Sequence, residues 1–466
     1  MENADHTPLP SLRAQTRKSS RFDDAKRVNL PNNGDASSCS GDGGSQSAMT
    51  MKSGKVVRFG AITLPASKSE SNRALMIAAY GGFTPDFQNL SDSMDTSVLM
   101  EALQGLPPKE SFATTQTNAR NDIGGNPHTI DIADCGTAAR FMTTYLACHE
   151  GEWLLTGTER MKQRPMAPLV DALRALGADI QYVEKEGCLP LQIKGKMLQG
   201  GKTTVDTTQS SQFASSLLLA APMCPQGLEI EMLGDLSSLP YLEMTLRMMR
   251  HFSAPAERKG RTVIVRHNPY EQQAFTVEPD WTAASYWYEM AAFSEECEIR
   301  LKGKGGPSTL RLASGTAGSG TACMQGDAII AEWMAQLGVG TYVEGGDLVL
   351  RKIPFEKHRP HFDFSNHPDL YPTIAATCAG LMVDAIFTGL DNLAIKESDR
   401  VEAMQVELAK LGNSPLHFSA HNDHRIVMAL APLSMLVGPV SFDHPEVVGK
   451  SYPNYWKDAS FLPIFG

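Results

Sequence analysis

The residues with the clearest chemical potential lie in one decapeptide, Leu64–Arg73, which reads LPASKSESNR. Lys68, Ser69 and Arg73 stand directly before an apolar run that predicts a helix. Backbone N–H groups at the start of a helix lack intrahelical partners, and the helix dipole favours an anion there. The decapeptide therefore predicts a cradle for a phosphate or carboxylate group, although a solvated helix start would carry the same residue types.

Basic residues recur at three later places, in predicted loops and helix starts. Residues 160–165 read RMKQRP, and arginine offers a planar fork that fits a carboxylate or a phosphate. Residues 396–400 read KESDR, which predicts Lys396 and Arg400 on one helical face with Glu397 between them in the sequence. Both segments fit an exposed basic turn or a surface ion-pair network as well as an anion clamp.

The third basic segment, residues 422–425, reads NDHR, and a late lysine, Lys450, follows it. Two isolated carboxylates, Asp369 and Glu397, are candidates for proton transfer, although Asp369 alone would also suit an N-cap. With the Ser-Ser-Gln run at 210–212, this set suits a pair of substrates that carry two phosphates and two carboxylates. Because His, Asp and Glu show no metal-ligand spacing, we expect no metal. The sequence has no Gly-x-Gly-x-x-Gly after a strand and no Walker A motif, which argues against a dinucleotide cofactor or P-loop chemistry.

Short strands, each followed by a polar loop and a helix, must position these side chains. A strand at 204–206 precedes a helix pattern over 213–221, and residues 228–232 alternate between apolar and polar side chains. Residues 398–411 show a helical period that Gly412 ends. This alternation continues to the C-terminus and predicts an α/β or α+β fold built from several repeated units.

Length and composition are those of a globular protein with two large domains: 466 residues, 42% hydrophobic and 20% charged. A net charge of −10 argues against general binding to nucleic acid or membrane surfaces, so cations must be concentrated locally. The eight cysteines form no C-x-x-C pair, which favours reduced thiols in a cytoplasmic enzyme. No apolar stretch approaches the ~20 residues that span a bilayer.

Residues 1–48 differ from the rest of the chain. They lack an apolar period and contain turn-type and linker-type runs, so we expect a disordered tail. Their Arg and Ser content would also suit an organelle transit peptide, but six acidic residues argue against that reading.

The motifs, in this order, resemble those of the enolpyruvyl transferase family, and within it the branch that acts on shikimate 3-phosphate. The family motifs LPGSKSxSNR, RMxxRP, SSQ, KE[ST]DR and NDHR correspond here to LPASKSESNR, RMKQRP, SSQ, KESDR and NDHR. The similarity extends from about Val56 to Pro463, nearly everything beyond the tail.

The resemblance implies a two-lobed α/β fold, an inverse α/β barrel-like arrangement of six βαβαββ units, with the active site in the cleft between the lobes. One lobe would span residues 67–278. The other would hold residues 49–66 together with 279–466, so that the chain would cross between the lobes twice.

The resemblance also implies ligand-binding roles at matching positions. Shikimate 3-phosphate would be held by Lys68, Ser69, Arg73, Ser210, Ser211, Gln212, Ser238, Tyr241, Asp369, Asn392 and Lys396. Phosphoenolpyruvate would be held by Lys68, Gly136, Arg164, Gln212, Arg400, Arg425 and Lys450.

The implied reaction transfers the enolpyruvyl group of phosphoenolpyruvate to the 5-hydroxyl group of shikimate 3-phosphate and releases phosphate. It belongs to the shikimate pathway, which leads to chorismate and the aromatic amino acids. Asp369 would take the hydroxyl proton, and Glu397 with Lys68 would handle the proton at C3 of phosphoenolpyruvate. We expect these two small molecules as the partners of a cytoplasmic monomer, with no cofactor.

Three residues depart from the family pattern: Ala66 replaces a common Gly, and Asp134 and Cys135 stand where Asn and Ala are usual. Asp134 and Cys135 are the two beside the implied phosphoenolpyruvate pocket. Both bear on affinity for phosphoenolpyruvate and on sensitivity to glyphosate, the inhibitor that occupies the same pocket. One alternative function is enolpyruvyl transfer to UDP-N-acetylglucosamine, but the loop at 158–164 lacks the cysteine usual in that branch. A second alternative is a non-catalytic phosphometabolite-binding relative, against which the presence of both Asp369 and Glu397 argues.

Overall fold

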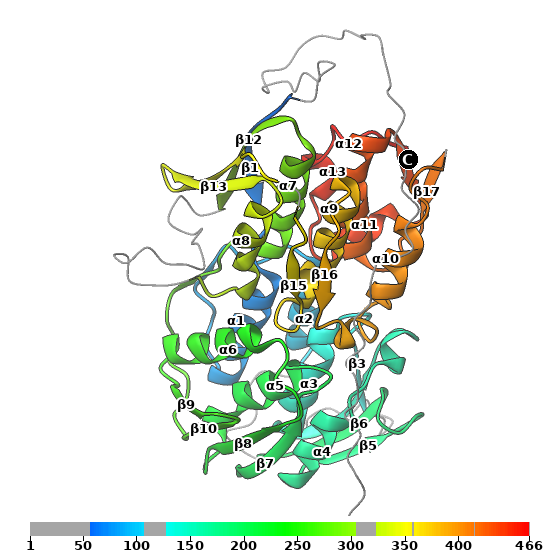
Figure 1. Ribbon diagram of the computed structural model, residues 1–466. Coiled ribbons are helices and arrows are strands. Elements are labelled where there is room, and N and C mark those ends of the chain that lie inside the picture. Colours follow the sequence, from blue (N-terminus) through cyan, green and yellow to red (C-terminus); the bar gives the residue numbers. More distant parts are fainter. Residues whose placement is uncertain (1–55, 107–126, 304–322, 357, 414, 466) are drawn as a thin grey trace, which may run out of the picture.

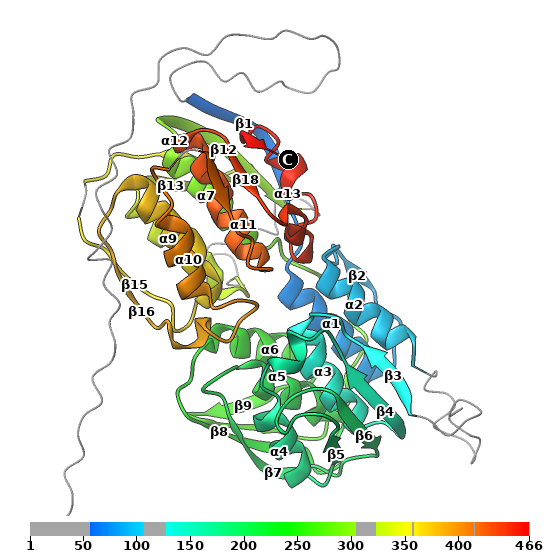
Figure 2. The ribbon, with the colours of Figure 1, turned by 90° about the vertical axis from the view of Figure 1, so that its right-hand side faces the viewer.

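The structure is a computed structural model that describes residues 56–106, 127–303, 323–356, 358–413 and 415–465. The expected tail, residues 1–48, lies outside the described residues, as do residues 49–55 of the expected second lobe. Two lobes lie one above the other in Figure 1, and the view turned by 90° in Figure 2 shows the same division.

Each lobe encloses its own apolar core. One core gathers buried side chains between Ala66 and Val277, and we call the surrounding part the α1–α6 lobe. The other core gathers Leu64 and buried side chains between Trp281 and Leu462, and we call its surroundings the α7–α13 lobe. Two separate cores are the expected arrangement for a chain of this length.

The strands form six sheets within the described ranges, and three of these sheets share one strand order. In each, two parallel strands are followed by an antiparallel hairpin whose second strand pairs back onto the sheet. The first contains β3 (His128–Asp131), α3 (Gly136–Ala147), β4 (Gly151–Thr156), α4 (Ala167–Ala175), β5 (Asp179–Tyr182) and β6 (Leu191–Gly195). This is the βαβαββ unit.

The second unit lies in the same lobe, and the third lies in the other. The second contains β7 (Gly201–Asp206), α5 (Gln212–Ala220), β8 (Leu228–Leu233), α6 (Leu239–His251), β9 (Ala256–Lys259) and β10 (Thr262–Val265). The third contains β1 (Val56–Leu64), α7 (Trp281–Phe293), β12 (Glu296–Gly303), α8 (Ile330–Ala335), β13 (Val339–Glu344) and β14 (Asp347–Lys352). Its first strand, β1, pairs with β12 although the whole α1–α6 lobe separates them in sequence.

The other three sheets are smaller, and all their strand pairs are parallel. They are β2 (Phe87–Gln88) with β11 (Phe275–Thr276), β15 (His361–Asp363) with β16 (Ile386–Thr388), and β17 (Leu416–Phe418) with β18 (Val440–Phe442) and β19 (Ile464–Phe465). The remaining α-helices are α1 (Lys68–Gly81), α2 (Met94–Gln104), α9 (Tyr371–Leu381), α10 (Arg400–Leu408), α11 (His424–Leu430), α12 (Ser434–Val437) and α13 (Tyr455–Asp458).

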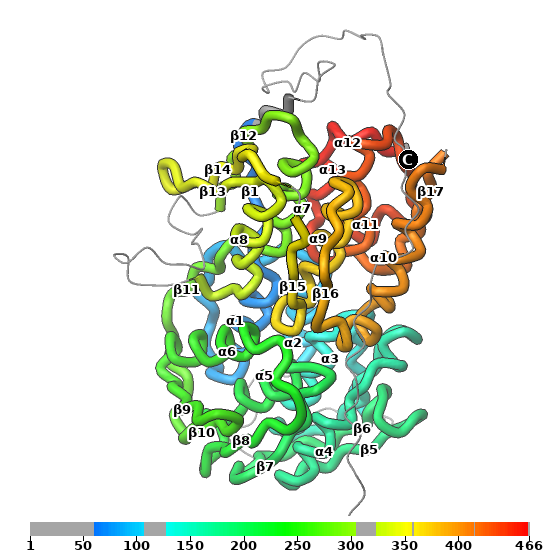
Figure 3. Tube along the Cα trace, viewed as in Figure 1, coloured from blue at the N-terminus to red at the C-terminus, as the bar shows by residue number. Residues whose placement is uncertain are grey.

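The chain passes between the lobes at two adjacent segments. Ala66 and Pro279 form an antiparallel bridge, and the backbone N–H of Ser67 donates to the carbonyl oxygen of Glu278 at 2.8 Å. The tube in Figure 3 lets the reader follow the blue segment from β1 in one lobe to α1 in the other. These paired crossings place the start of α1 at the boundary between the lobes.

Several predicted elements are confirmed, but the helix predicted over residues 398–411 begins later and ends earlier than expected. Helix α5 and strand β8 occupy the predicted places. Helix α10, however, begins only at Arg400, because the Asp399 carboxylate caps the N–H groups of Val401 and Glu402. Lys396 therefore lies outside the helix and does not share a helical face with Arg400. The helix also ends at Leu408 rather than close to Gly412.

Candidate active site

Six helix starts carry residues singled out in the sequence. Lys68, Gly136, Gln212 and Arg400 are the first residues of α1, α3, α5 and α10, respectively. Ser238 precedes α6, and Arg425 is the second residue of α11. The predicted association of these residues with helix starts is confirmed, and it places backbone N–H groups that lack intrahelical partners beside them.

Asp369 lies at the centre of the cation cluster, in the short 3-10 turn Pro368–Leu370 rather than at an N-cap. Its two carboxylate oxygens accept hydrogen bonds from Arg400 Nη1 at 2.8 Å and Arg425 Nη2 at 2.8 Å. The hydroxyl group of Tyr241, from the other lobe, donates to the same carboxylate at 3.1 Å. Burial alone would raise the pKa of Asp369, but Arg425 and Arg400 outweigh it and hold this pKa well below its ordinary value.

Glu397 is the second carboxylate of the cluster. Arg400 Nη2 donates to its Oε2 at 2.9 Å, while Lys450 Nζ and Arg164 Nη1 lie 3.9 Å and 4.0 Å from its Oε1. Burial would raise the pKa of Glu397, but Arg400, Lys450 and Arg164 together hold it well below its ordinary value. Both candidate acid–base groups are therefore ionised in this arrangement.

A third carboxylate, Asp423, supports this centre and was not singled out from the sequence. It accepts a hydrogen bond from Arg400 Nε at 2.8 Å and caps α11 through the backbone N–H of Arg425 at 3.0 Å. Arg400 thus binds three carboxylates, and its side chain is only 1% exposed. The sequence signal for Asp423 was its position directly before the apolar run of α11. The sequence does not show that Asp423 contacts Arg400 in α10.

Two lysines of the predicted site are also paired with acids that lay outside the predicted set. Lys68 Nζ donates to Asp95 Oδ2 at 2.8 Å. Lys450 Nζ donates to Asp134 Oδ2 at 2.6 Å and to the Asp134 carbonyl oxygen at 3.0 Å. These carboxylates offset the positive charge of the two lysines.

Arg73 differs from the other predicted anion-binding cations. Its Nε donates to Thr245 Oγ1 at 2.7 Å, and its two terminal nitrogens donate to the carbonyl oxygens of Ser69 at 2.9 Å and Tyr241 at 3.3 Å. The side chain is buried beside the ring of Phe141. The guanidinium group therefore joins α1 to α6, and the structure gives every one of its nitrogens a protein partner.

The predicted polar ligands are spread over both lobes. The Ser210 hydroxyl accepts the N–H of Gln212 at 3.2 Å, and Gln212 Nε2 donates to Thr137 Oγ1 at 3.1 Å, whereas Ser211 is buried. Across the lobe boundary, Asn392 Nδ2 donates to Ser237 Oγ at 2.8 Å, next to Ser238.

Lys396 is half-buried near this boundary, and its carbonyl oxygen accepts a hydrogen bond from Arg160 Nη2 at 2.9 Å. Burial lowers the pKa of its ammonium group. Arg160 Nε also donates to the carbonyl oxygen of Glu397 at 3.1 Å. The basic loop at 160–165 therefore reaches from one lobe to the backbone that carries Lys396 and Glu397.

Gly136 is required where Arg164 approaches α3. A Cβ at this position would lie 2.5 Å from Arg164 Nη1 and 2.8 Å from Arg140 Nη1. Real side chains do not tolerate such distances, so a larger residue would displace the Arg164 guanidinium. The two residues expected to share a ligand are therefore also sterically coupled.

His424 is buried in the same cluster. Among the described residues, neither ring nitrogen has a hydrogen-bond partner. Burial and the nearby cations Lys68 and Arg425 hold the pKa of His424 well below its ordinary value, so the ring is neutral. His424 belongs to the NDHR segment but was not among the site residues predicted from the sequence.

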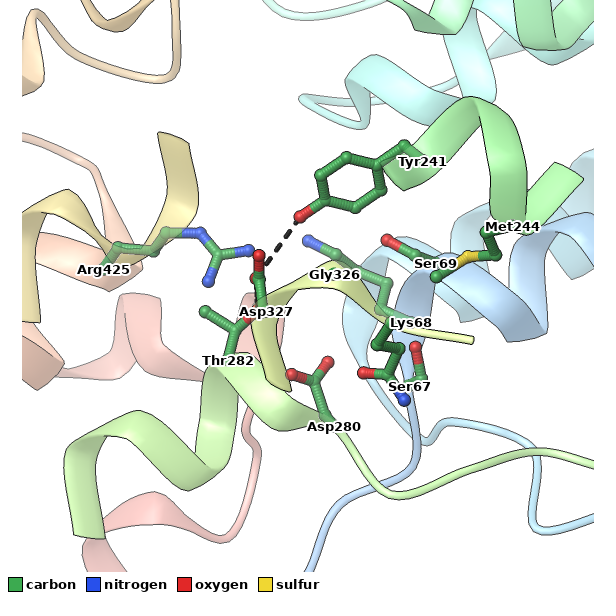
Figure 4. A pocket seen from close by; sticks show the side chains of 11 residues that line it. Ser67, Lys68, Ser69, Tyr241, Met244, Asp280, Thr282, Gly326, Asp327 and Arg425 are labelled. Atoms are coloured by element: carbon green, nitrogen blue, oxygen red, sulfur yellow. Dashed lines mark hydrogen bonds between the residues drawn. The ribbon is translucent and has the colours of Figure 1, made fainter. Parts of the chain in front are cut away.

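A pocket lies beside this cluster (Figure 4). Lys68, Ser69 and Tyr241 line it from one lobe, and Asp327 and Arg425 line it from the other. The Tyr241 hydroxyl points toward Asp327 at 3.4 Å. A ligand here would touch both lobes at once.

The geometry is that of a site for multiply charged anions. Arg164, Arg400, Arg425 and Lys450 all lie within 4.0 Å of Asp369 or Glu397. These cations come from loops and helix starts of both lobes. Neither at this site nor elsewhere in the described part of the chain does a group of three or more potential metal ligands occur. No helix in the described residues is long and apolar enough to cross a membrane.

Comparison with solved structures agrees with the fold. An EPSP synthase structure from Acinetobacter baumannii superposes with a TM-score of 0.62 at 19% identity, covering 88% of this chain and 97% of that chain. The enolpyruvyl transferase NikO from Streptomyces tendae gives a TM-score of 0.56 at 14% identity, covering 88% of this chain and 95% of that chain. The chain has the two-lobed α/β fold of the enolpyruvyl transferases.

Sequence comparison narrows the class. A family model described as EPSP synthase (3-phosphoshikimate 1-carboxyvinyltransferase) matches residues 56–459. A 3-phosphoshikimate 1-carboxyvinyltransferase from Bacteroides fragilis is 41% identical over 419 residues, which cover 85% of this chain and 93% of the relative. One from a Sulfurovum species is 33% identical, with coverage of 86% and 97%. The chain belongs to the EPSP synthase family, and the two alternative functions weighed above are disfavoured.

Proposed function

We propose that the cleft binds shikimate 3-phosphate and phosphoenolpyruvate and catalyses the family's reaction. Enolpyruvyl transfer releases phosphate and leaves an enolpyruvyl ether on the 5-hydroxyl group. The observation that carries this proposal is the cluster of four cations around Asp369 and Glu397, at a boundary that both lobes line. Such a preorganised cluster stabilises negative charge that moves onto a departing phosphate.

Asp369 is proposed as the base that accepts the 5-hydroxyl proton while the hydroxyl oxygen attacks C2 of phosphoenolpyruvate. Its pairing with Arg400 and Arg425 makes it a weak base before substrate binds. An anionic substrate that takes up Arg425 would withdraw one of these cations and raise the pKa of the carboxylate toward the range useful for proton transfer.

Glu397 is proposed to handle the proton at C3, with Lys68 in support. Because Arg400, Lys450 and Arg164 keep Glu397 ionised, it must first take up a proton from solvent, and a bound anion that occupies these cations would favour this by raising its pKa. Delivery of that proton to C3 gives a tetrahedral ketal, and the Glu397 carboxylate then removes a proton from C3 as the bond between C2 and the phosphate oxygen breaks. The contacts of Glu397 with Arg400, and its closeness to Lys450 and Arg164, support a place beside the phosphate-bearing carbon. Lys68 contributes from the start of α1 in the opposite lobe.

The remaining assignments follow the same division. We propose Ser69, Arg73, Ser210, Ser211, Gln212, Ser238, Tyr241, Asn392 and Lys396 as the shikimate 3-phosphate side of the site. We propose Gly136, Arg164, Arg400, Arg425 and Lys450 as the phosphoenolpyruvate side, where Gln212 and Lys68 also contribute. For Arg73, the hydrogen bonds that each of its three nitrogens donates within the protein favour a supporting role beneath Ser69 and Tyr241 over direct contact.

We also propose the lobe boundaries at residues 67–278 and at 49–66 with 279–466. The bridge between Ala66 and Pro279 supports these limits. A cytoplasmic location is proposed because the seven cysteines in the described residues are free thiols, which suits a reducing compartment. The expected monomeric state stays a prediction.

Steady-state phosphate release tests the proposed activity. With shikimate 3-phosphate and phosphoenolpyruvate and no added metal, we expect turnover and a product heavier than shikimate 3-phosphate by one enolpyruvyl group. Turnover with UDP-N-acetylglucosamine in place of shikimate 3-phosphate, and none with shikimate 3-phosphate, would show the assignment to be wrong.

A further inference from the structure

The ion pair between Asp134 and Lys450 joins the two lobes across the cleft. Asp134 stands just before α3 in the α1–α6 lobe, and Lys450 ends the 3-10 turn Pro445–Lys450 in the α7–α13 lobe. The ammonium group donates to Asp134 Oδ2 at 2.6 Å and to the Asp134 backbone carbonyl oxygen at 3.0 Å. The Lys450 side chain is 11% exposed and that of Asp134 is 31% exposed.

Lys450 already faces a second carboxylate, because Glu397 Oε1 lies 3.9 Å from its ammonium group. The other oxygen of Asp134, Oδ1, is buried and accepts no hydrogen bond from the described residues. One ammonium group is thus shared by two carboxylates, one of which has an unused acceptor oxygen. An anionic ligand at Lys450 would bring a third negative charge to the same cation.

We propose that Asp134 is a specificity-determining residue of the anion site, which holds Lys450 across the cleft and weakens its attraction for phosphate-bearing ligands. This inference rests on the proposed function, in which Lys450 contacts phosphoenolpyruvate. The carboxylate opposes binding of the incoming anion both by its own charge and by occupying the ammonium group. Asp134 therefore sets the affinity for phosphoenolpyruvate without touching the reacting atoms.

Asp134→Asn separates charge from position. The amide oxygen of asparagine can still accept a hydrogen bond from Lys450, and the backbone carbonyl oxygen remains a second acceptor in any variant. The substitution removes the negative charge and places an NH2 group where Oδ1 accepts no hydrogen bond from the described residues, so no acceptor contact is lost. A change in substrate affinity would then report electrostatics rather than a displaced lysine.

The experiment compares Michaelis constants and phosphate binding in the wild-type protein and Asp134→Asn. We expect the KM for phosphoenolpyruvate to fall by about threefold to tenfold, as removal of one like charge near a partly exposed site implies. The kcat and the KM for shikimate 3-phosphate should change by less than about twofold, because the charge is removed from the phosphoenolpyruvate side. The dissociation constant of inorganic phosphate, measured by calorimetry, should fall together with the KM for phosphoenolpyruvate.

Salt separates an electrostatic role from a structural one. Because Asp134 is partly exposed, the difference between the two proteins should shrink as KCl rises from 50 to about 300 mM, where the Debye length is short. The matched control is Asp131→Asn, three residues earlier, where Oδ1 accepts the N–H of Ala133 at 2.8 Å and an amide oxygen can do the same. This control removes the same charge from the end of β3, next to the loop that carries Asp134, and should leave both constants within about twofold.

The inference would be overturned if Asp134→Asn bound phosphate no more tightly than the wild type. It would also be overturned if the variant's gain in phosphate affinity did not shrink as the salt concentration rises. If Asp134→Asn does not fold, Asp134→Ser serves the same comparison and should also bind phosphate more tightly. Absence of turnover in the wild-type protein would refute the proposed function instead, since the phosphate titration needs no turnover.

Discussion

A single guanidinium group organises the chemistry at the scale of residues. Arg400 donates to Asp369, Glu397 and Asp423, so both proposed acid–base groups share one fixed cation. That arrangement keeps the two carboxylates ionised and correctly placed before any ligand arrives. It also makes their basicity depend on what the neighbouring cations bind.

Neutral substitution of the two carboxylates tests their roles. We expect Asp369→Asn and Glu397→Gln each to lower kcat by at least about 100-fold, because each removes a proton-transfer group. Binding of both substrates should persist, since the cations remain. Stopped-flow kinetics and calorimetry would measure the two effects. Glu402→Gln, an exposed position in the first turn of the same helix α10, is the control; unaltered rates in both active-site variants would remove the proposed roles.

Glu289 gives a pH-dependent prediction away from the cleft. It lies fully buried in α7, and neither carboxylate oxygen has a hydrogen-bond partner in the described residues. Burial raises its pKa well above the ordinary 4.5, so the folded protein holds the neutral acid. The unfolded chain ionises near pH 4.5, and folding stability therefore falls as pH rises from there toward the folded pKa.

We expect Glu289→Gln to abolish this fall of folding stability with pH, because the amide does not ionise. The melting temperature of the variant minus that of the wild type should therefore increase steadily between pH 5 and about pH 8. Differential scanning calorimetry at several pH values would measure the difference. A constant offset across that range would show that Glu289 does not titrate in this way.

Among the secondary-structure elements, the helix starts carry most of the proposed site residues. The Asp caps of two of these helices, α10 and α11, can be compared by substitution. Asp399 caps α10 and Asp423 caps α11, but only Asp423 also binds Arg400 in the interior. We expect Asp399→Ala to cost about 1 kcal/mol, as the loss of a cap does. Asp423→Ala should cost about 3 kcal/mol or more, because it also breaks a buried ion pair.

Chemical denaturation measures both values. Because Asp423 touches Arg400, its variant should also lose kcat, whereas Asp399→Ala should retain it. Similar destabilisation in the two variants would mean that the pair between Arg400 and Asp423 contributes little to folding.

The helix starts could be predicted from local sequence, but their ionic partners could not. An apolar run after LPASKSESNR or NDHR identifies where α1 and α11 begin, because capping and burial are local properties. The contacts of Lys68 with Asp95 and of Lys450 with Asp134 join distant segments, and no local pattern encodes such a pair. The predicted helical pairing of Lys396 with Arg400 failed for a local reason, since the Asp399 cap starts α10 after Lys396.

The division into two lobes is the property of the whole molecule on which the site depends. Strand β1 pairs with β12 although all the residues of the α1–α6 lobe lie between them in the sequence. Hydrophobic periodicity alone could not predict this pairing, whereas the family resemblance implied that the chain crosses between the lobes twice. Residues of both lobes then line one pocket. Substrates that bind there should stabilise both lobes together.

Ligand-linked unfolding tests this coupling. At 100 times their dissociation constants, shikimate 3-phosphate and phosphoenolpyruvate should each add about 2.7 kcal/mol of stability, raising the melting temperature by a few degrees. In Arg164→Ala, the added shift from phosphoenolpyruvate should largely disappear at the same concentration, while that from shikimate 3-phosphate remains. An undiminished shift in this variant would place phosphoenolpyruvate away from Arg164.

A crystal structure of Glu397→Gln with both substrates bound is the most direct test of the shared cleft. The account predicts phosphoenolpyruvate between Arg164, Arg425 and Lys450, with the 5-hydroxyl group of shikimate 3-phosphate within hydrogen-bonding distance of Asp369. Density for either substrate outside this cleft, on one lobe alone, would contradict the account.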